Sequence, residues 1–431
     1  MKELFEQRVR SYFGEDSNLF LTKLNEPATQ ALFLNTSKAN KDKILSLIDF
    51  PLKKSPLSNE NYYYESDNIG KTKAYELGLI YPQDIAASLT TSFFKDKNIN
   101  IIVDMCAAPG GKSINILNRV NKDALLIAND VSHDRASILT SNLERLGLDN
   151  VIITNKDTSI LSEQLSGYAD LVILDAPCSG EGMIRKFPEI FDTYSLSNIE
   201  NLAQIQKKLL EEAYVMLSRG GFLVYSTCTY AFEEDEDQIE SFLQRHSDMK
   251  LVKIDMPSFS RIEGTVKLSP LNDTEGQFFA IMIKEGEEES SRIKPLKTVK
   301  EKLVDDFIKE NLLIKDYYLY KYNEHFYLSL KSLPDLKNSI MRYGIYLGDV
   351  VKKRFEPSHA LYRSNTLIGK FRYVYDLHDK EYDSFISGNE LKINEESHYY
   401  LVTYKGISLG YGKCSNGILK NKYPKGLRRM L

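Results

Sequence analysis

The feature that most constrains the fold is a regular alternation, between residues 99 and 225, of short apolar runs with amphipathic helical stretches. The runs occupy five segments: 99–103, 124–128, 151–154, 171–174 and 221–225. Each run is continuously apolar, which is typical of strands buried on both faces of a parallel sheet, and the helical stretches supply the crossovers. We therefore predict an α/β domain with a doubly wound parallel sheet. The run 278–283 predicts a further strand at its edge.

The segments outside this sheet differ from it in composition. Helical stretches at 5–13 and 17–24, followed by a mixed segment, predict a small α/β module at the N-terminal end. Tyr- and Phe-rich runs at 317–322 and 399–404, broken by Gly and Asn, predict a β-rich C-terminal region. The charged stretch 285–291 predicts a linker. We therefore divide the chain into five parts: 1–75, 76–285, the linker 286–300, an intermediate region 301–360 and a last domain 361–431.

Composition limits the classes of protein to which the chain can belong. With 431 residues, 42% of them hydrophobic, it can bury more than one core, since domains usually settle near ~100 to 200 residues. No stretch approaches the roughly 18 to 20 uninterrupted apolar residues of a membrane helix, and the first ten residues carry charges where a signal peptide is apolar. We therefore expect a cytoplasmic monomer that does not associate with membranes.

Cysteine spacing and charge narrow the choice of partners. The four cysteines lie far apart, with no Cys-x-x-Cys pair and no histidine at zinc-finger spacing, so we expect no metal site. The net charge is −4, and acidic runs such as 233–237 offset much of the positive charge. The last dozen residues, in contrast, are basic: Lys420, Lys422, Lys425, Arg428 and Arg429.

The segment after the first apolar run predicts a ligand site, because ligands of open α/β sheets bind at the carboxyl ends of the strands. It reads Asp104-Met-Cys-Ala-Ala-Pro-Gly-Gly-Lys-Ser113, a turn of small residues that opens a helix. Small residues let a ligand approach the backbone, and a helix N-terminus offers free N–H groups. A phosphate-binding P-loop needs a glycine where Cys106 stands, and the Gly-x-Gly-x-x-Gly fingerprint is absent. The loop therefore favours a ligand without a pyrophosphate, such as S-adenosylmethionine.

Acidic residues also follow the next two runs. Asp130 stands after the second run, where a carboxylate accepts hydrogen bonds from ribose hydroxyls. Asp157 follows the third run, at the position that meets an adenine edge. One such residue is commonly structural, but three in succession, counting Asp104, favour the S-adenosylmethionine interpretation.

Two cysteines follow the fourth and fifth runs and so face the same crevice. Cys178 stands in Asp175-Ala-Pro-Cys-Ser-Gly-Glu-Gly-Met183, and Cys228 in Tyr225-Ser-Thr-Cys-Thr-Tyr230. Carbon 5 of a pyrimidine is too weak a nucleophile to attack a methyl sulfonium directly, but a thiolate that adds to carbon 6 makes carbon 5 enamine-like. After methylation, the proton on carbon 5 must be removed before the thiol can leave. Two cysteines and a carboxylate match these tasks.

These motifs resemble those of the Nop/Sun family of RNA cytosine-5 methyltransferases, with matches at 104–112, 175–182 and 226–229. The resemblance implies a Rossmann-like S-adenosylmethionine methyltransferase sheet. It also implies that Cys228 is the nucleophile, that Cys178 assists product release, and that Asp175 holds the cytosine edge and the methionyl end of S-adenosylmethionine. The implied cofactor contacts are Cys106, Ala107, Ala108, Pro109, Gly110, Gly111, Lys112, Asp130, Arg135, Asp157 and Asp175.

Both ends of the chain resemble the bacterial small-subunit ribosomal RNA methyltransferase F group within that family. The matching segments are 5–8, 24–27, 354–360, 409–413 and 420–428. This resemblance implies that the N-terminal module binds RNA, that the last domain is a PUA-like RNA-binding domain, and that the partner is 16S rRNA or the small ribosomal subunit. On this basis the basic tail becomes an RNA contact.

Other interpretations remain open. A tRNA cytosine-5 methyltransferase would carry the same catalytic motifs. A catalytically idle RNA-binding factor of ribosome assembly could keep the fold and the cofactor pocket, although it has no need of two thiols at strand ends. A P-loop NTPase is disfavoured by the missing glycine.

Overall fold

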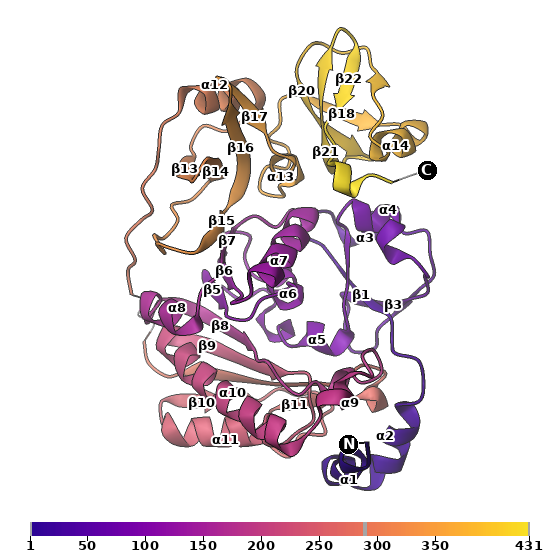
Figure 1. Ribbon diagram of the computed structural model, residues 1–431, viewed down its shortest axis with the longest axis vertical. Helices are drawn as coiled ribbons and strands as arrows, with labels where there is room; N and C mark the ends of the chain where they lie inside the picture. The colour runs from indigo at the N-terminus through magenta and orange to yellow at the C-terminus, as the bar shows by residue number, and fades with distance from the viewer. Residues whose placement is uncertain (1, 288–290, 430–431) are drawn as a thin grey trace.

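The computed structural model describes residues 2–287 and 291–429, which form a central sheet with smaller units at both ends of the chain (Figure 1). The N-terminal unit begins with α1 (Lys2–Phe13) and α2 (Ser17–Lys23), as predicted. A four-stranded antiparallel sheet follows, in the order β2-β3-β1-β4. The elements of this part are β1 (Ala31–Leu34), α3 (Lys41–Leu45), β2 (Leu52–Lys54), β3 (Asn61–Tyr64), α4 (Lys73–Glu76), β4 (Ile80–Pro82) and α5 (Ile85–Leu89). The predicted α/β module is therefore confirmed.

The central sheet has nine strands in the order β10-β12-β9-β8-β5-β6-β7-β15, and β11 also pairs with β12. The strands are β5 (Ile101–Asp104), β6 (Leu125–Asn129), β7 (Val151–Thr154), β8 (Ala169–Asp175), β9 (Leu217–Thr227), β10 (Met249–Leu251), β11 (Val266–Leu268), β12 (Gln277–Lys284) and β15 (Ile340–Tyr343). The five strands from β9 to β7 are parallel to one another. This confirms the doubly wound core predicted from the five apolar runs.

The prediction for residues 278–283 is right about the strand and wrong about its place at the edge. β12 pairs antiparallel with β9, and both β10 and β11 pair with β12. These two strands have only three residues each, so they do not stand out as apolar runs. At the other edge β15, which comes from the intermediate region, pairs antiparallel with β7. Segments that are distant in the sequence therefore complete one sheet.

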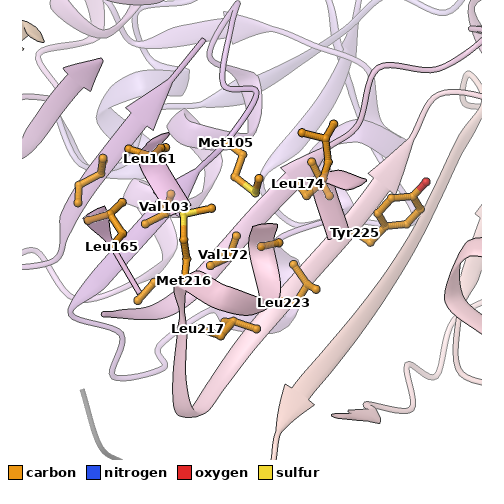
Figure 2. Packing of buried hydrophobic residues seen from close by; sticks show 14 of the residues in the cluster. Val103, Met105, Leu161, Leu165, Val172, Leu174, Met216, Leu217, Leu223 and Tyr225 are labelled. Carbon is orange, nitrogen blue, oxygen red and sulfur yellow. The ribbon is translucent and has the colours of Figure 1, made fainter. Parts of the chain in front are cut away.

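Helices cover both faces of the sheet: α6 (Gly111–Arg119), α7 (His133–Leu146), α8 (Thr158–Gln164), α10 (Leu196–Met216) and α11 (Glu236–Arg245). The short helix α9 (Ile190–Thr193) packs instead with α1. Successive strand residues point to opposite faces. Val103 therefore packs with Leu161 of α8 and Met216 of α10, as Figure 2 shows, whereas Ile102 packs with α6 and α7. Each fully buried Leu or Ile side chain contributes roughly 1.5 to 3 kcal/mol. Burial on both faces explains why the strands are continuously apolar.

The C-terminal region is rich in β-structure, as predicted. After α12 (Lys302–Asn311), an antiparallel sheet has the order β13-β14-β16-β17, and a final sheet has the order β18-β20-β21-β22-β19. The elements are β13 (Tyr318–Tyr322), β14 (His325–Ser329), β16 (Ile345–Val351), β17 (Arg354–Pro357), α13 (His359–Arg363), β18 (Val374–Leu377), α14 (Asp379–Ile386), β19 (Leu391–Lys392), β20 (Tyr399–Tyr404), β21 (Ile407–Ser415) and β22 (Ile418–Asn421). Residues 288–290 of the predicted linker lie outside the described residues.

The two ends of the chain share one hydrophobic core. Leu32 and Leu34 of β1 belong to the same buried cluster as Leu377, Tyr382 and Leu409 of the last sheet and its helix. Figure 1 shows α3 and α4 next to this C-terminal unit. The N-terminal and C-terminal units therefore stabilise each other. In the described parts of the chain, no helix combines the length and the apolar character needed to cross a membrane.

Candidate active site

The loop between β5 and α6 contains the predicted cofactor contacts 106–112. Ala107 N donates to Asn129 O at 2.8 Å, so the loop is held against the end of β6. Gly110 has a φ of 115°, in the left-handed region that favours glycine, and α6 begins at the next residue without a side-chain cap. The first N–H groups of α6 are therefore available to a ligand.

Two polar groups at the start of this loop, Asp104 and Cys106, have raised pKa values. Asp104, at the end of β5, accepts a hydrogen bond from Ser113 Oγ at 2.6 Å. Burial raises the pKa of Asp104 to about 7. Burial also raises the pKa of Cys106 to about 12, so Cys106 remains a thiol. A protonated thiol is not the reactive form of a cysteine nucleophile.

Asp130 lies beside the same loop, in contact with Arg135. The residue is 2% exposed, and its Oδ1 accepts a hydrogen bond from Ser132 N at 3.0 Å. Its Oδ2 is buried and accepts no hydrogen bond from the described residues, although Arg135 Nη2 lies 3.5 Å away. The same Arg135 nitrogen donates to Ala108 O at 2.7 Å. A free buried acceptor beside a glycine-containing loop fits a ribose hydroxyl, so these residues suit S-adenosylmethionine.

Asp157 has a different environment from Asp130. It is exposed, and its Oδ1 accepts hydrogen bonds from Ser159 N at 2.9 Å and Ser159 Oγ at 2.5 Å. These hydrogen bonds cap α8 and lower the pKa of Asp157. These contacts make Asp157 the N-cap of α8. Its role at an adenine edge stays a prediction.

The two predicted catalytic cysteines lie side by side. Cys178 Sγ is 3.2 Å from Cys228 Sγ, and Cys228 N donates to Cys178 Sγ at 3.3 Å. Both are free thiols and partly exposed. The hydrogen bond with Cys228, together with burial, raises the pKa of Cys178 well above its usual value. Cys414, in contrast, is buried in the last domain.

Asp175 connects the cofactor loop to the cysteines. Its Oδ2 lies 2.7 Å from Lys112 Nζ, and its Oδ1 accepts a hydrogen bond from Ser226 Oγ at 2.9 Å. Asp175 precedes Cys178 by three residues, and Ser226 precedes Cys228 by two. One carboxylate therefore contacts both the cofactor loop and the strand that leads to Cys228.

A close approach of two glycines shapes the loop after Cys178. Gly276 N donates to Gly182 O at 3.0 Å, and Gly182 N donates to Cys228 O at 2.9 Å. A Cβ atom at Gly182 would lie 2.5 Å from Gly276 Cα. No larger residue fits there without moving backbone, so the spacing Ser-Gly-Glu-Gly after Cys178 has a steric reason.

A buried carboxylate below the cysteines was missed by the sequence analysis. Glu234 accepts hydrogen bonds from Ser179 N at 3.0 Å, from Ser179 Oγ at 2.5 Å and from Gln206 Nε2 at 2.8 Å. Ser179 Oγ also lies 2.8 Å from Thr229 Oγ1. Glu234 thus anchors the residue after Cys178 and, through it, the residue after Cys228. Burial raises the pKa of Glu234 to about 7.

The acidic run 233–237 was interpreted as offsetting charge, and its central residues are instead buried. Lys267 Nζ lies 2.7 Å from Glu236 Oε2 and 3.1 Å from Asp235 Oδ2, and all three side chains are fully buried. A buried carboxylate needs a partner, and the partner here is distant in the sequence. The pattern Ser-Thr-Cys-Thr followed within ten residues by consecutive acids is the signal that could have indicated this support.

The basic tail divides into two groups. Lys420, Lys422 and Lys425 are exposed. Arg428 Nε donates to Tyr423 O at 3.1 Å, and Arg429 Nε lies 2.6 Å from Glu76 Oε1 of the N-terminal unit. The three lysines are available to a partner, whereas the two arginines make contacts within the chain. Among residues 2–287 and 291–429, no three His, Cys, Asp or Glu side chains are arranged to hold a metal ion.

Four family models match consecutive parts of the chain. Residues 1–85 match the N-terminal domain of 16S rRNA methyltransferase RsmF, and 91–284 match 16S rRNA methyltransferase RsmB/F. Residues 306–364 match the first C-terminal domain of RsmF rRNA methyltransferase, and 372–429 match the RsmF PUA domain. The order of the four matches reproduces one domain architecture along nearly the whole chain.

Individual proteins and a solved structure are also similar to this chain. A tRNA (cytosine(49)-C(5))-methyltransferase of Pyrococcus abyssi is 34% identical over 65% of this chain and 96% of its own length. Ribosomal RNA small subunit methyltransferase F of Shewanella sediminis is 27% identical over 95% of this chain and 92% of its own. A crystal structure of a methyltransferase homologue from Pyrococcus horikoshii covers 65% of this chain and 94% of its own, with a TM-score of 0.58 and 28% identity.

Proposed function

The chain belongs to the 16S rRNA methyltransferase RsmB/F family of S-adenosylmethionine-dependent RNA cytosine-5 methyltransferases, and from this we propose that it methylates carbon 5 of a cytosine in 16S rRNA with Cys228 as the covalent nucleophile. The observation that carries the proposal is the 3.2 Å contact between the sulfur atoms of Cys178 and Cys228, at the end of the crevice that Asp175 links to the cofactor loop.

The raised pKa of Cys178 supports this division of roles. A thiol whose pKa is raised keeps its proton, so Cys178 donates to the sulfur of Cys228 and stabilises a thiolate there. The Cys228 thiolate adds to carbon 6 of the cytosine, and the electron pair of the carbon 5–carbon 6 bond becomes available at carbon 5. S-Adenosylmethionine, held by residues 106–112 and Asp130, supplies the methyl group when bound.

Product release then depends on Cys178. Once Cys228 is bonded to carbon 6, it no longer bears the charge that holds the proton on Cys178, so Cys178 can lose that proton to solvent. Its thiolate takes the proton from carbon 5, the carbon 5–carbon 6 double bond forms again, and Cys228 leaves as a thiolate. In this mechanism Asp175 accepts a hydrogen bond from the cytosine edge, and its contacts with Lys112 and Ser226 support that role.

Single cysteine variants test this mechanism. Cys228→Ala should form no covalent adduct and no 5-methylcytosine. Cys178→Ala should methylate but accumulate a protein–RNA adduct that survives a denaturing gel. If Cys228→Ala kept full activity, or if both variants behaved alike on the gel, the assignment of the two thiols would be wrong.

The proposed substrate is 16S rRNA and not tRNA. The Pyrococcus abyssi relative is named for a tRNA reaction, but its match covers only 65% of this chain. The two RsmF-type domains at 306–364 and 372–429 support rRNA as the substrate, and we propose that Lys420, Lys422 and Lys425 contact its phosphates. Bisulfite sequencing of rRNA and tRNA from a deletion strain, with and without the gene restored, tests this. Loss of a tRNA methylation with unchanged 16S rRNA would reverse the choice.

A further inference from the structure

A cleft lies at the amino ends of β6 and β7, whereas the two cysteines follow the carboxyl ends of β8 and β9. Its volume is about 430 Å³, within the ~300 to 1,000 Å³ of ligand pockets. It opens beside the turns that precede β6 and β7, at residues 121–123 and 147–150, and thus at the amino ends of these strands. Ser37 of the N-terminal unit and the segments after β14 and α13 complete its walls. Four parts of the chain therefore build one cleft that the catalytic mechanism does not use.

The side chains of the cleft combine apolar surface with lysines. Leu117, Leu330 and Ile368 are part of the lining, and Ile368 is 52% exposed. Lys122 and Lys370 also line the cleft, and neither forms an ion pair within the described residues. An apolar wall next to unpaired ammonium groups is suited to an aromatic base that carries a phosphate.

Buried cations behind the cleft add to its positive charge. Lys38 follows Ser37 and is buried, and its Nζ has no hydrogen-bond partner among residues 2–287 and 291–429. Burial and the neighbouring Arg363 and Arg145 lower the pKa of Lys38, so the positive charge behind the cleft comes from these two buried arginines. Two carboxylates line the cleft, Asp149 and Asp123, and Asp123 forms an ion pair with Lys331 at 3.2 Å. Lys122 and Lys370, with Arg145 and Arg363 behind them, outnumber the remaining carboxylate of Asp149, and the resulting potential favours an anion in the cleft.

We propose that this cleft binds a nucleotide of the RNA substrate, with its phosphate between Lys122 and Lys370 and its base against Ile368 and Leu330. The proposal rests on the proposed function, because it requires RNA as the substrate. It adds a further point of attachment, remote from the target cytosine. RNA bound at both ends of the parallel strands would be oriented before the cytosine reaches Cys228, so the cleft should affect substrate affinity and not the chemical step.

The double variant Lys122→Gln/Lys370→Gln tests the charged part of this site. We expect weaker binding of a 16S rRNA fragment, and a slope of log affinity against log salt that falls by about 0.7 to 0.9 for each lost phosphate contact. KM for the RNA should rise and kcat should stay the same. The matched control is Lys302→Gln/Lys309→Gln, two exposed lysines of α12 that line no part of the cleft. An unchanged salt slope in the cleft variant, or the same change in the control, would overturn the proposal.

Two further measurements distinguish a nucleotide of the RNA substrate from a free nucleotide as the ligand of the cleft. RNA that contains a photoreactive uridine should crosslink to the segments 117–123 or 365–370, and Ile368→Asp should remove that crosslink. Calorimetry with cytidine monophosphate and with adenosine monophosphate tests whether a free nucleotide binds. Tight binding of a free nucleotide with no RNA crosslink in the cleft would contradict the proposal. If the wild-type chain still bound and methylated RNA in that case, the proposed function would stand and only the cleft would lose its role.

Discussion

Lys112 Nζ lies 2.7 Å from Asp175 Oδ2, and this ion pair joins the cofactor loop to the segment that carries Cys178. The Lys112 side chain is 8% exposed and that of Asp175 is 37% exposed. Ser226 Oγ holds the other carboxylate oxygen at 2.9 Å. A carboxylate fixed at both oxygens has one orientation, so the direction in which Asp175 faces a substrate depends on Lys112.

Lys112→Met should therefore impair catalysis more than folding. Losing a hydrogen bond to a charged group costs roughly 1 to 3 kcal/mol, and the partial exposure of Asp175 moves the expected value to the lower part of that range. We expect kcat to fall by about tenfold, measured in single-turnover methylation assays. Lys112→Arg is the control, because it keeps the charge and should retain more activity than Lys112→Met. Equal activity of wild type and Lys112→Met would show that Asp175 does not need this partner.

Asp130→Asn tests the free acceptor beside the cofactor loop. The variant keeps an oxygen that can accept from Ser132 N. It loses the negative charge, and an NH2 group takes the place of the buried Oδ2, which has no hydrogen-bond partner among the described residues. The predicted ribose contact should weaken, and calorimetry should record at least a tenfold loss of S-adenosylmethionine affinity, on the order of 1.4 kcal/mol. RNA affinity serves as the internal control and should not change. An unaltered cofactor dissociation constant would remove Asp130 from the site.

The sequence was sufficient to predict the parts of the fold that follow from local pattern. Continuous apolar runs identified all five parallel strands because both of their faces are buried. The position of β12 inside the sheet was not predictable in the same way, because the two strands that cover it have three residues each. The strand β15 was not predictable either, because its pairing with β7 joins segments far apart in the chain.

In the candidate site too, strand order predicted some contacts, whereas contacts between distant segments were not predictable. The order of strands places residues that follow β8 and β9 next to each other, so the contact between Cys178 and Cys228 was predictable from topology. Glu234 was not, because a run of acids has the composition of a solvated surface and its burial depends on partners such as Ser179 and Gln206. The shared core of the two ends of the chain was also hidden, since it requires a tertiary contact between β1 and the last sheet.

Arg363 should be among the residues most important for stability, because it joins three units. Its guanidinium donates to Ser408 O at 2.9 Å, to Glu76 O at 3.0 Å and to Arg145 O at 2.5 Å. Arg363→Met would leave these buried carbonyls without their donor, and each unsatisfied group costs roughly 1 to 3 kcal/mol. We expect at least about 3 kcal/mol of destabilisation in chemical denaturation.

Arg372→Met is the control for this prediction, because Arg372 also donates to backbone carbonyls but does so in an exposed position. Its effect should stay below about 1 kcal/mol. A similar loss in both variants would mean that burial at the junction is not what makes Arg363 important. The same junction explains why point variants test RNA binding better than a truncation near residue 360, which would uncover the core shared by the N-terminal and C-terminal units.

Glu234 should make stability fall between about pH 4.5 and pH 7. Burial raises its pKa from 4.5 to about 7 in the folded chain, so the folded state holds a proton that the unfolded state releases in this interval. The stabilisation is fully present below pH 4.5 and is lost as the pH rises to 7. The size of the effect is up to roughly 3 kcal/mol, at 1.36 kcal/mol per unit of pKa. Glu234→Gln should reduce the dependence of Tm on pH, and Asp104, whose pKa is also about 7, contributes to the dependence that remains.

Glu234→Ala tests whether this carboxylate also positions Cys178. Without it, Ser179 loses two hydrogen bonds, and the proposed proton acceptor Cys178 should be misplaced after the Cys228 adduct forms. We expect the variant to accumulate a protein–RNA adduct on a denaturing gel, as Cys178→Ala should, because addition is kept and release is slowed. Glu234→Gln retains an acceptor for Ser179 N and should release product normally. A Glu234→Ala variant that is less stable but shows no adduct would leave Glu234 with a purely structural role.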